Sequence, residues 1–193
     1  MRDVLVIDIE TKNTILDVGG DQFIKNLDIS LACAYSYNRG VILSFWEDEL
    51  PKLAELMRTA GLIIGFSINR FDLPVLSKHL PFSVQSLKRL DLLEEIEASW
   101  GRRVSLNVLA EANLGKGKTL HSGLEAIRLW NEGKFDELKA YCENDVLITR
   151  DLYDFALEKG HVMVPDQKTG ALVRIEMAFR DRVQAIVAEA TLF

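Results

Sequence analysis

The stretch "VLVIDIET", residues 4–11, is an apolar run that nevertheless contains two carboxylates. Side chains alternate between the two faces of a β-strand, so Asp8 and Glu10 share one face with Val6. An ionised carboxylate that is buried without a partner costs several kcal/mol. The stretch therefore predicts a covered strand of a sheet whose two acids face cations or hydrogen-bond donors.

Length and composition indicate a globular protein. The chain has 193 residues, 48% of them hydrophobic and 27% charged, and we expect one domain spanning residues 1–193. No apolar run approaches the roughly 20 residues of a membrane span, and acids interrupt the N-terminal segment too early for a secretory signal. We expect a cytoplasmic protein with no membrane partner. Cys33 and Cys142 lack the spacing of a zinc or disulfide motif and are interpreted as packing residues.

Apolar periodicity and turn signals divide the chain into strands and helices. We expect strands at 3–10, 29–37, 41–46 and 62–67, a weaker strand near 88–93, and a hairpin at 161–177. Helices are expected at 48–61, 72–80, 105–115, 121–133, 135–160 and 183–193. This order predicts an α/β fold in which helices flank a mixed sheet, with a C-terminal β-hairpin and helix.

Two further acids occupy positions where apolar residues are expected. Asp145 falls on the apolar stripe of the helix expected at 135–160, and Tyr141 lies one turn before it on the same face. Asp72 follows the buried strand 62–67, at an edge of the sheet where ligands commonly bind.

Each acid also has a structural interpretation. Asp72 is a possible helix N-cap with Pro74 in the first turn, Asp145 a possible partner of a buried Arg or Lys, and Glu10 a possible solvated strand end. Four acids in such positions together favour a metal site, because carboxylate oxygens suit Mg²⁺ or Mn²⁺. Two such ions about 3.5 to 4 Å apart stabilise the attacking and leaving oxygens in phosphodiester hydrolysis.

Three short motifs then resemble a known family. "DIE" at 8–10, "NRFD" at 69–72 and "YCEND" at 141–145 are similar, in order and spacing, to the motifs of the DEDD 3′–5′ exonucleases in the ribonuclease H-like superfamily. The third motif has the Tyr-x-x-x-Asp form of the DEDDy branch, which includes proofreading domains of DNA polymerases. The His branch is disfavoured because Ala140 occupies its His position. The resemblance implies a five-stranded mixed sheet whose first three strands are antiparallel.

The resemblance also implies roles for individual residues and two divalent cations, Mg²⁺ or Mn²⁺. Asp8, Glu10 and Asp145 would bind one metal ion. Asp8 would bridge to the second ion, which Asp72 would support. Tyr141 would hold the attacking water, and its phenol, with an ordinary pKa of about 10, is a poor base near neutral pH. Such an enzyme removes nucleoside 5′-monophosphates from the 3′ end of nucleic acid.

Charge bears on the substrate. The net charge of -6 argues against a broad polyanion-binding face, although two divalent ions, carrying four positive charges, would bring it to about -2. An enzyme that binds only a strand end needs few phosphate contacts. We expect a basic stretch to contact the nucleic-acid backbone, although an ordinary solvated loop is the alternative interpretation. We expect residues beside the motifs to contact the terminal nucleotide, although Phe71 also suits the core. The first set is Arg102, Arg103, Lys116 and Lys118, and the second is Thr11, Asn69 and Phe71.

Two other functions remain as alternatives. "ANLGKGKT" at 112–119 fits a loose P-loop pattern, but an expected helix precedes it, whereas a P-loop follows a strand. A ribonuclease H-like module that binds nucleic acid or protein without cutting would be expected to lack an acid, and none is missing. We favour single-stranded DNA over RNA as substrate, in proofreading or repair, with a polymerase, helicase or repair protein as a possible partner in trans.

Overall fold

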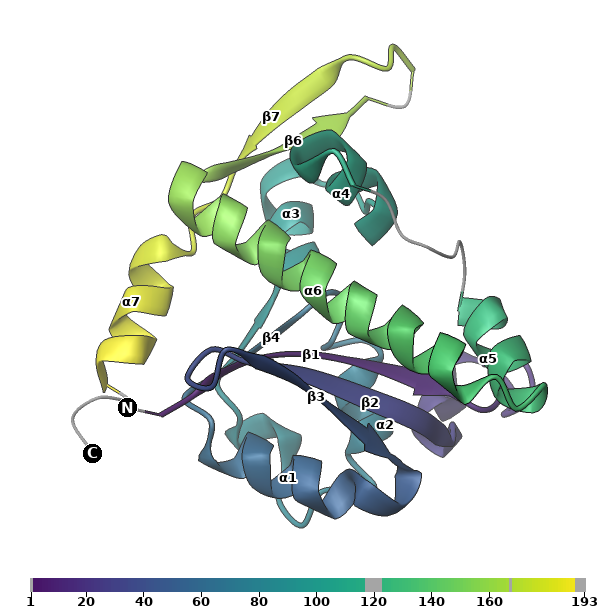
Figure 1. Cartoon of the computed structure of the whole chain (residues 1–193). Helices are drawn as coiled ribbons and strands as arrows, with labels where there is room; N and C mark the ends of the chain where they lie inside the picture. The colour runs from purple at the N-terminus through teal and green to yellow at the C-terminus, as the bar shows by residue number, and fades with distance from the viewer. Residues whose placement is uncertain (1, 117–122, 167, 190–193) are drawn as a thin grey trace.

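A five-stranded mixed sheet forms the centre of the computed structural model, which describes residues 2–116, 123–166 and 168–189 (Figure 1). Its strand order is β3-β2-β1-β4-β5. The strands are β1 (Val4–Thr11), β2 (Ile29–Ser36), β3 (Val41–Trp46), β4 (Leu62–Gly65) and β5 (Arg89–Asp91). The first three pair antiparallel, whereas β4 is parallel to β1 and to β5. The predicted sheet is confirmed: it has five strands and is mixed, with its first three strands antiparallel.

Helices cover both faces of the sheet. The long helix α6 (Phe135–Lys159) lies across one face, and α1 (Leu50–Thr59) and α2 (Asp72–Leu76) lie on the other (Figure 1). The alternation of β1 explains this division, because Leu5 and Ile7 belong to the apolar cluster with α1 and α2, whereas Val6 belongs to the cluster with α6. Asp8 and Glu10 therefore lie on the face that α6 covers, as the sequence predicts.

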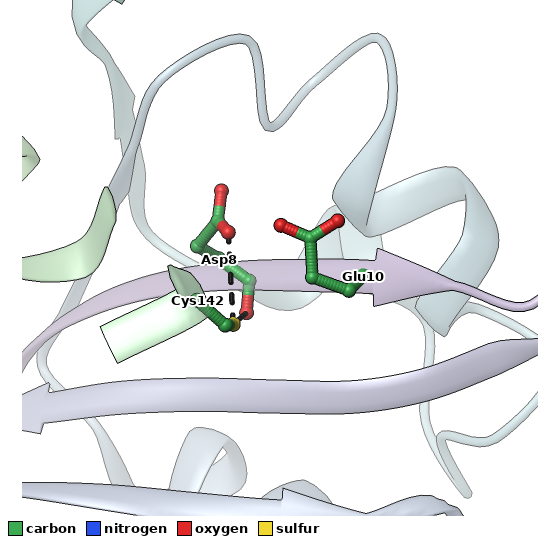
Figure 2. A group of neighbouring side chains, drawn as sticks. All are labelled: Asp8, Glu10 and Cys142. Carbon is green, nitrogen blue, oxygen red and sulfur yellow. Dashed lines mark hydrogen bonds between the residues drawn. The ribbon is translucent and has the colours of Figure 1, made fainter. Parts of the chain in front are cut away.

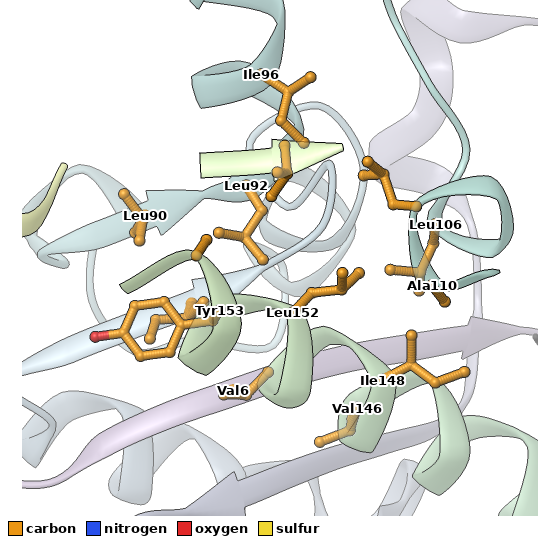
Figure 3. Close-up of a cluster of buried hydrophobic side chains, with 14 of the residues drawn as sticks. Val6, Leu90, Leu92, Ile96, Leu106, Ala110, Val146, Ile148, Leu152 and Tyr153 are labelled. Carbon is orange, nitrogen blue, oxygen red and sulfur yellow. The ribbon is translucent and has the colours of Figure 1, made fainter. Parts of the chain in front are cut away.

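The centre of α6 is fixed by apolar packing. Figure 3 shows Val146, Ile148 and Leu152 of this helix among side chains of α3 (Leu92–Trp100) and α4 (Leu106–Leu114). Helix α5 (Gly123–Asn131) packs against β1 and α6 near the other end of that helix. Because α6 is held along its length, its N-terminal half is positioned over the acidic end of β1.

The C-terminal part of the described chain is the expected hairpin and helix. Strands β6 (His161–Pro165) and β7 (Leu172–Glu176) pair antiparallel, and α7 (Arg180–Glu189) follows. The Asn113 amide ties the hairpin to α4, since its Nδ2 donates to the Met163 carbonyl at 2.8 Å and its Oδ1 accepts from the Met163 amide at 2.7 Å. Residues 190–193 of the expected closing helix lie outside the described residues.

Several element boundaries differ from the sequence expectations. Helix α3 was not predicted, because only a short strand was expected near 88–93. The helix expected at 72–80 ends at Leu76, where the Ser77 hydroxyl donates to the Pro74 carbonyl, a local bond that competes with helix continuation. Three short 3₁₀ helices also form, η1 (Asp21–Asn26), η2 (Glu47–Glu49) and η3 (Val84–Ser86). Within the described ranges, no helix combines the length and apolar character that crossing a membrane requires.

Candidate active site

Asp8 and Glu10 form the centre of the candidate site. Figure 2 shows their carboxylates on the same side of β1, which is the face covered by α6. Glu10 is only 8% exposed, so the interpretation of this residue as a solvated strand end is wrong. Two carboxylates on one covered face raise each other's electrostatic energy unless positive charge or hydrogen-bond donors compensate them.

Asp72 joins the two acids from the start of α2, directly after the loop that follows β4. Its side chain is 3% exposed, and its Oδ1 accepts from the backbone amide of Ile9 at 3.1 Å. Ile9 lies between Asp8 and Glu10, so this bond ties the Asp72 carboxylate directly to the acidic stretch of β1. The N-cap interpretation is wrong, because Phe71 is the N-cap of α2 and no side chain caps that helix.

Asp145 and Tyr141 complete the group from α6. They are 2% and 3% exposed, respectively. Burial raises the pKa of the Tyr141 phenol well above its ordinary value, and the negative charges of Asp145, then Glu10 and Asp8, raise this pKa further. The phenol therefore keeps its proton at neutral pH. Its hydroxyl is therefore available in this site as a hydrogen-bond donor.

All five residues line one cavity of about 600 Å³. Three segments far apart in the sequence contribute them: β1, the start of α2 and the N-terminal half of α6. Apolar side chains make up much of the remaining wall, among them Ile9, Ile15, Leu27, Phe71 and Ile127. The cavity thus combines a compact acidic centre with apolar walls large enough for a ligand of nucleotide size.

A second cavity of about 760 Å³ adjoins the first. The two share Asp8, Phe66 and Ser67 in their linings, so they meet beside the acidic centre. The rest of its lining comes from α3, residues 103–105, the start of α4 and the hairpin residues Pro165 and Asp166.

The acidic centre has the donor chemistry of a hard divalent cation site. Ligand atoms of Asp8, Glu10 and Cys142 lie within 4.8 Å of one another. Burial raises the pKa of the Cys142 thiol well above its ordinary value, so the sulfur keeps its proton. The thiol donates to the carbonyl and to Oδ2 of Asp8, each at 3.7 Å (Figure 2). The carboxylate oxygens, not the sulfur, are therefore the groups that fit Mg²⁺ or Mn²⁺.

Two of the three residues expected to contact a terminal nucleotide line the first cavity. Thr11 and Phe71 are in its wall, and the Thr11 hydroxyl donates to the Asn13 carbonyl at 2.9 Å. The structure does not bring Asn69 to this cavity. The Asn69 side chain donates to Glu94 at 2.6 Å and accepts from Arg89 at 2.6 Å, and it lines a separate hollow of about 260 Å³.

The basic residues are dispersed. Arg103 lines the second cavity, where its Nη2 donates to the Ser67 hydroxyl at 3.4 Å. Arg102 lies 3.9 Å from Asp166, and Lys116 lies 3.6 Å from Asp151. The side chains of Arg102, Arg103 and Lys116 are all more than half exposed. The ion pairs of Arg102 and Lys116 are therefore weak. Lys118 lies outside the described residues.

The P-loop alternative lacks its structural context in the described part of the segment. Residues 112–114 belong to α4, and Gly115 ends that helix with φ 64°. A P-loop follows a buried strand, whereas this segment follows a helix. Lys118 and Thr119 of the pattern lie outside the described residues.

Residues that the sequence reasoning missed surround the acids. Leu16 and Leu124 line the first cavity although they are 87% and 65% exposed, so they flank its opening. A single exposed Leu in a loop or at a helix start is common, and the sequence contains no signal that separates these two from others. Ser67 has φ 69°, and Asp91 is 3% exposed at the start of α3. The sequence did contain a signal for Asp91, because an Asp followed three residues later by a Glu, here Glu94, is typical of a helix N-terminus.

The α/β fold carries an acidic centre that fits divalent cations, and comparison with known families narrows the class of protein further. Residues 81–168 match the model of a family described as a predicted 3′–5′ exonuclease related to the exonuclease domain of PolB. This match confirms the resemblance to 3′–5′ exonucleases, and its segment includes Tyr141 and Asp145 of the third motif. A search of curated proteins gives no match. Residues 81–168 are thus similar to an exonuclease-related domain, which supports nuclease activity in general.

Proposed function

We propose that this protein is a metal-dependent 3′–5′ exonuclease of the DEDDy type that acts on single-stranded nucleic acid, with DNA favoured over RNA. The observation that carries the proposal is the convergence of four buried or half-buried acids and one protonated tyrosine on a single cavity. An unrelated structural role for each acid would not bring three distant segments together in this way. The proposal treats residues 1–193 as one catalytic domain.

The two adjoining cavities support a path for the strand. The first has apolar walls that suit the base and sugar of a terminal nucleotide. The second contains the guanidinium of Arg103, which suits a backbone phosphate. The bond to be cut would then lie beside Asp8, where the cavities meet. Leu16 and Leu124 would contact the terminal base at the opening of the first cavity.

The chemistry follows from the residues in the wall. Asp8, Glu10, Asp72 and Asp145 would hold two divalent cations, whose positive charge would stabilise the attacking and leaving oxygens. The Tyr141 hydroxyl orients the attacking water. The water oxygen bonds to phosphorus while the bond from phosphorus to the 3′ oxygen of the preceding nucleotide breaks. The attacking water loses a proton to solvent, the departing 3′ oxygen takes a proton from solvent, and a nucleoside 5′-monophosphate is released. Cys142 donates to Asp8 and holds its carboxylate in place.

A digestion experiment tests the proposal. Single-stranded DNA and RNA oligonucleotides labelled at the 5′ end are incubated with Mg²⁺, with Mn²⁺ or with EDTA, and the Asp8→Asn variant is the control. We expect a metal-dependent ladder that shortens from the 3′ end, is absent in the variant, and forms faster on DNA. Metal-independent binding of the oligonucleotides without any cleavage would instead favour a silent binding module.

The cellular context is a further part of the proposal. The two adjoining cavities suit a free strand end, which proofreading and repair both produce. A polymerase, helicase or repair protein acting in trans would supply such an end, and a cytoplasmic location fits this role. Addition of a candidate partner to the digestion experiment tests this part, because a functional partner should increase the rate on substrates whose 3′ end is initially paired.

A further inference from the structure

Asp91 accepts more hydrogen bonds than a helix cap requires. As the N-cap of α3, its Oδ1 accepts from the amides of Leu93 at 3.0 Å and Glu94 at 3.4 Å. The same oxygen accepts from the Ser67 amide at 2.8 Å, and its Oδ2 accepts from the Asn69 amide at 3.0 Å. Half of these donors therefore belong to the loop between β4 and α2, and one of them makes the shortest of the four bonds.

This loop, residues 66–71, adopts a backbone conformation that needs support. Ser67 has φ 69°, and no other non-glycine residue among those described has a positive φ. A residue in this region costs on the order of 1–3 kcal/mol and persists only where its surroundings hold it. Asp91 supplies that support on both sides of Ile68, a side chain that is fully buried.

The loop connects Asp91 to the acidic centre. Phe66 and Ser67 line both cavities together with Asp8. The Ser67 carbonyl accepts from the amides of Arg70 and Phe71, each at 3.1 Å, so the loop is braced up to the residue before Asp72. Asp72 in turn accepts from Ile9 at 3.1 Å. A continuous set of short bonds therefore runs from Asp91 through the loop to β1.

Other acids of α3 contact the same loop with weaker effect. Glu94 accepts from the Asn69 side chain at 2.6 Å, and Glu97 pairs with Arg70 at 2.7 Å. Arg70 is 47% exposed, so its ion pair contributes little. Asp91 is 3% exposed and bonds the backbone itself, which makes it the principal attachment of the loop to α3.

We propose that Asp91 is a positioning residue for the candidate active site. It holds the loop 66–71 through the Ser67 and Asn69 amides and thereby fixes the Asp72 carboxylate relative to Asp8 and Glu10. The inference rests on the proposed function for its effect on turnover. Its effect on the loop itself is independent of that function.

The variant Asp91→Ser separates this role from helix capping. Ser is about as good an N-cap as Asp, but its single short hydroxyl cannot accept from Ser67 and Asn69 while it caps α3. Asp91→Asn is the second variant, since it keeps one acceptor oxygen and places an NH₂ donor opposite an amide. Val183→Ala, at a buried position of α7 away from both cavities, is the control for a general loss of stability.

The first measurement is amide hydrogen exchange of the metal-free protein. In Asp91→Ser we expect faster exchange in residues 66–71, with the amides of Leu93 and Glu94 still protected. In Val183→Ala we expect the loop to exchange as in the unsubstituted protein. Unchanged loop exchange in both Asp91 variants would overturn the proposal, whatever the enzyme does with oligonucleotides.

The second measurement is turnover at a temperature where all variants are folded. We expect Asp91→Ser to reduce kcat by 10- to 100-fold, the size of loss that follows when support around a metal ligand is removed, with KM for the oligonucleotide nearly unchanged. Asp91→Asn should fall between this variant and the unsubstituted protein. Normal kcat in Asp91→Ser would also overturn the proposal. A lack of cleavage by the unsubstituted protein would reject the proposed function, and loop exchange would then decide on Asp91.

Discussion

The surroundings of Tyr141 determine what its hydroxyl can do. The phenol is buried beside three carboxylates, each of which opposes its ionisation. A group that keeps its proton across the working pH range of most enzymes can orient a water but cannot remove a proton from it. The role assigned to Tyr141 therefore concerns geometry in the transition state, and its removal should affect rate more than binding.

Tyr141→Phe tests this assignment. We expect kcat to fall on the order of 10²-fold, because only the group that orients the water is lost, while KM changes little. Steady-state kinetics on a labelled oligonucleotide measures both quantities. Tyr153→Phe is a matched control, since Tyr153 is a buried tyrosine of the same helix that stacks on Phe179 outside the cavity linings. An equal loss of kcat and of substrate affinity in Tyr141→Phe would contradict the orienting role.

Individual site residues could be predicted from the sequence where an acid interrupted an apolar pattern. Asp8 and Glu10 interrupt an apolar strand, and Asp145 interrupts the apolar stripe of a helix, so burial of a charge made each of them conspicuous. Leu16 and Leu124 violate no pattern, because exposed leucines are common on protein surfaces. Asn69 belongs to a motif, yet its side chain turns to Glu94 and Arg89, a choice that depends on long-range contacts.

At the scale of elements, long periodic segments were predictable and the segment around α3 was not. The helix expected at 135–160 matches α6 closely, because many apolar positions define its period. Residues 88–93 contain only three apolar residues, too few to distinguish a strand from a helix. The structure divides this segment between β5 and α3, and Asp91 is both the last residue of β5 and the N-cap of α3. Pairing of β5 with β4 decides the boundary, and that contact is not local.

The junction between β4 and its loop depends on Gly65. A Cβ at this position would lie 1.9 Å from Ile68 Cγ2 and 3.1 Å from the Ile7 carbonyl oxygen. Ile68 is fully buried, so it cannot move into solvent to make room. We expect Gly65→Ala to reduce the free energy of unfolding by about 1–3 kcal/mol, as overpacking of a core does.

Urea unfolding of Gly65→Ala measures this loss, and Gly123→Ala provides the control. A Cβ added at Gly123 would meet no heavy atom within 4 Å beyond its chain neighbours and the backbone of its own helix, and Gly123 lies in the first turn of α5. Ala is the better helix former, so this control should be neutral or more stable by up to about 1 kcal/mol. A Gly65→Ala protein with an unchanged midpoint would show that the loop can shift at Ile68 without loss of packing.

At the scale of the whole molecule, the candidate site concentrates the negative charge of an already acidic chain. The net charge is -6, and four of the acids converge on one cavity. Convergence of like charges in a covered site opposes folding, so the site is maintained at the expense of stability. Bound divalent cations would compensate this repulsion. Removal of one of the acids should therefore stabilise the metal-free protein but reduce the stabilisation that metal provides.

Asp145→Asn should therefore stabilise the metal-free protein and remove its response to metal. In EDTA we expect the variant to unfold at a higher temperature, with a gain of about 0.5–2 kcal/mol from relieved repulsion. With Mg²⁺ at about 100 times its Kd, the unsubstituted protein should gain about 2.7 kcal/mol, and the variant much less. Thermal unfolding with Mg²⁺ and with EDTA measures both effects.

Asp136→Asn, which removes an exposed acid from the first turn of the same helix, should keep the Mg²⁺ response. A variant at Asp145 that is destabilised in EDTA and still stabilised by Mg²⁺ would mean that this carboxylate supports the fold and not the metal.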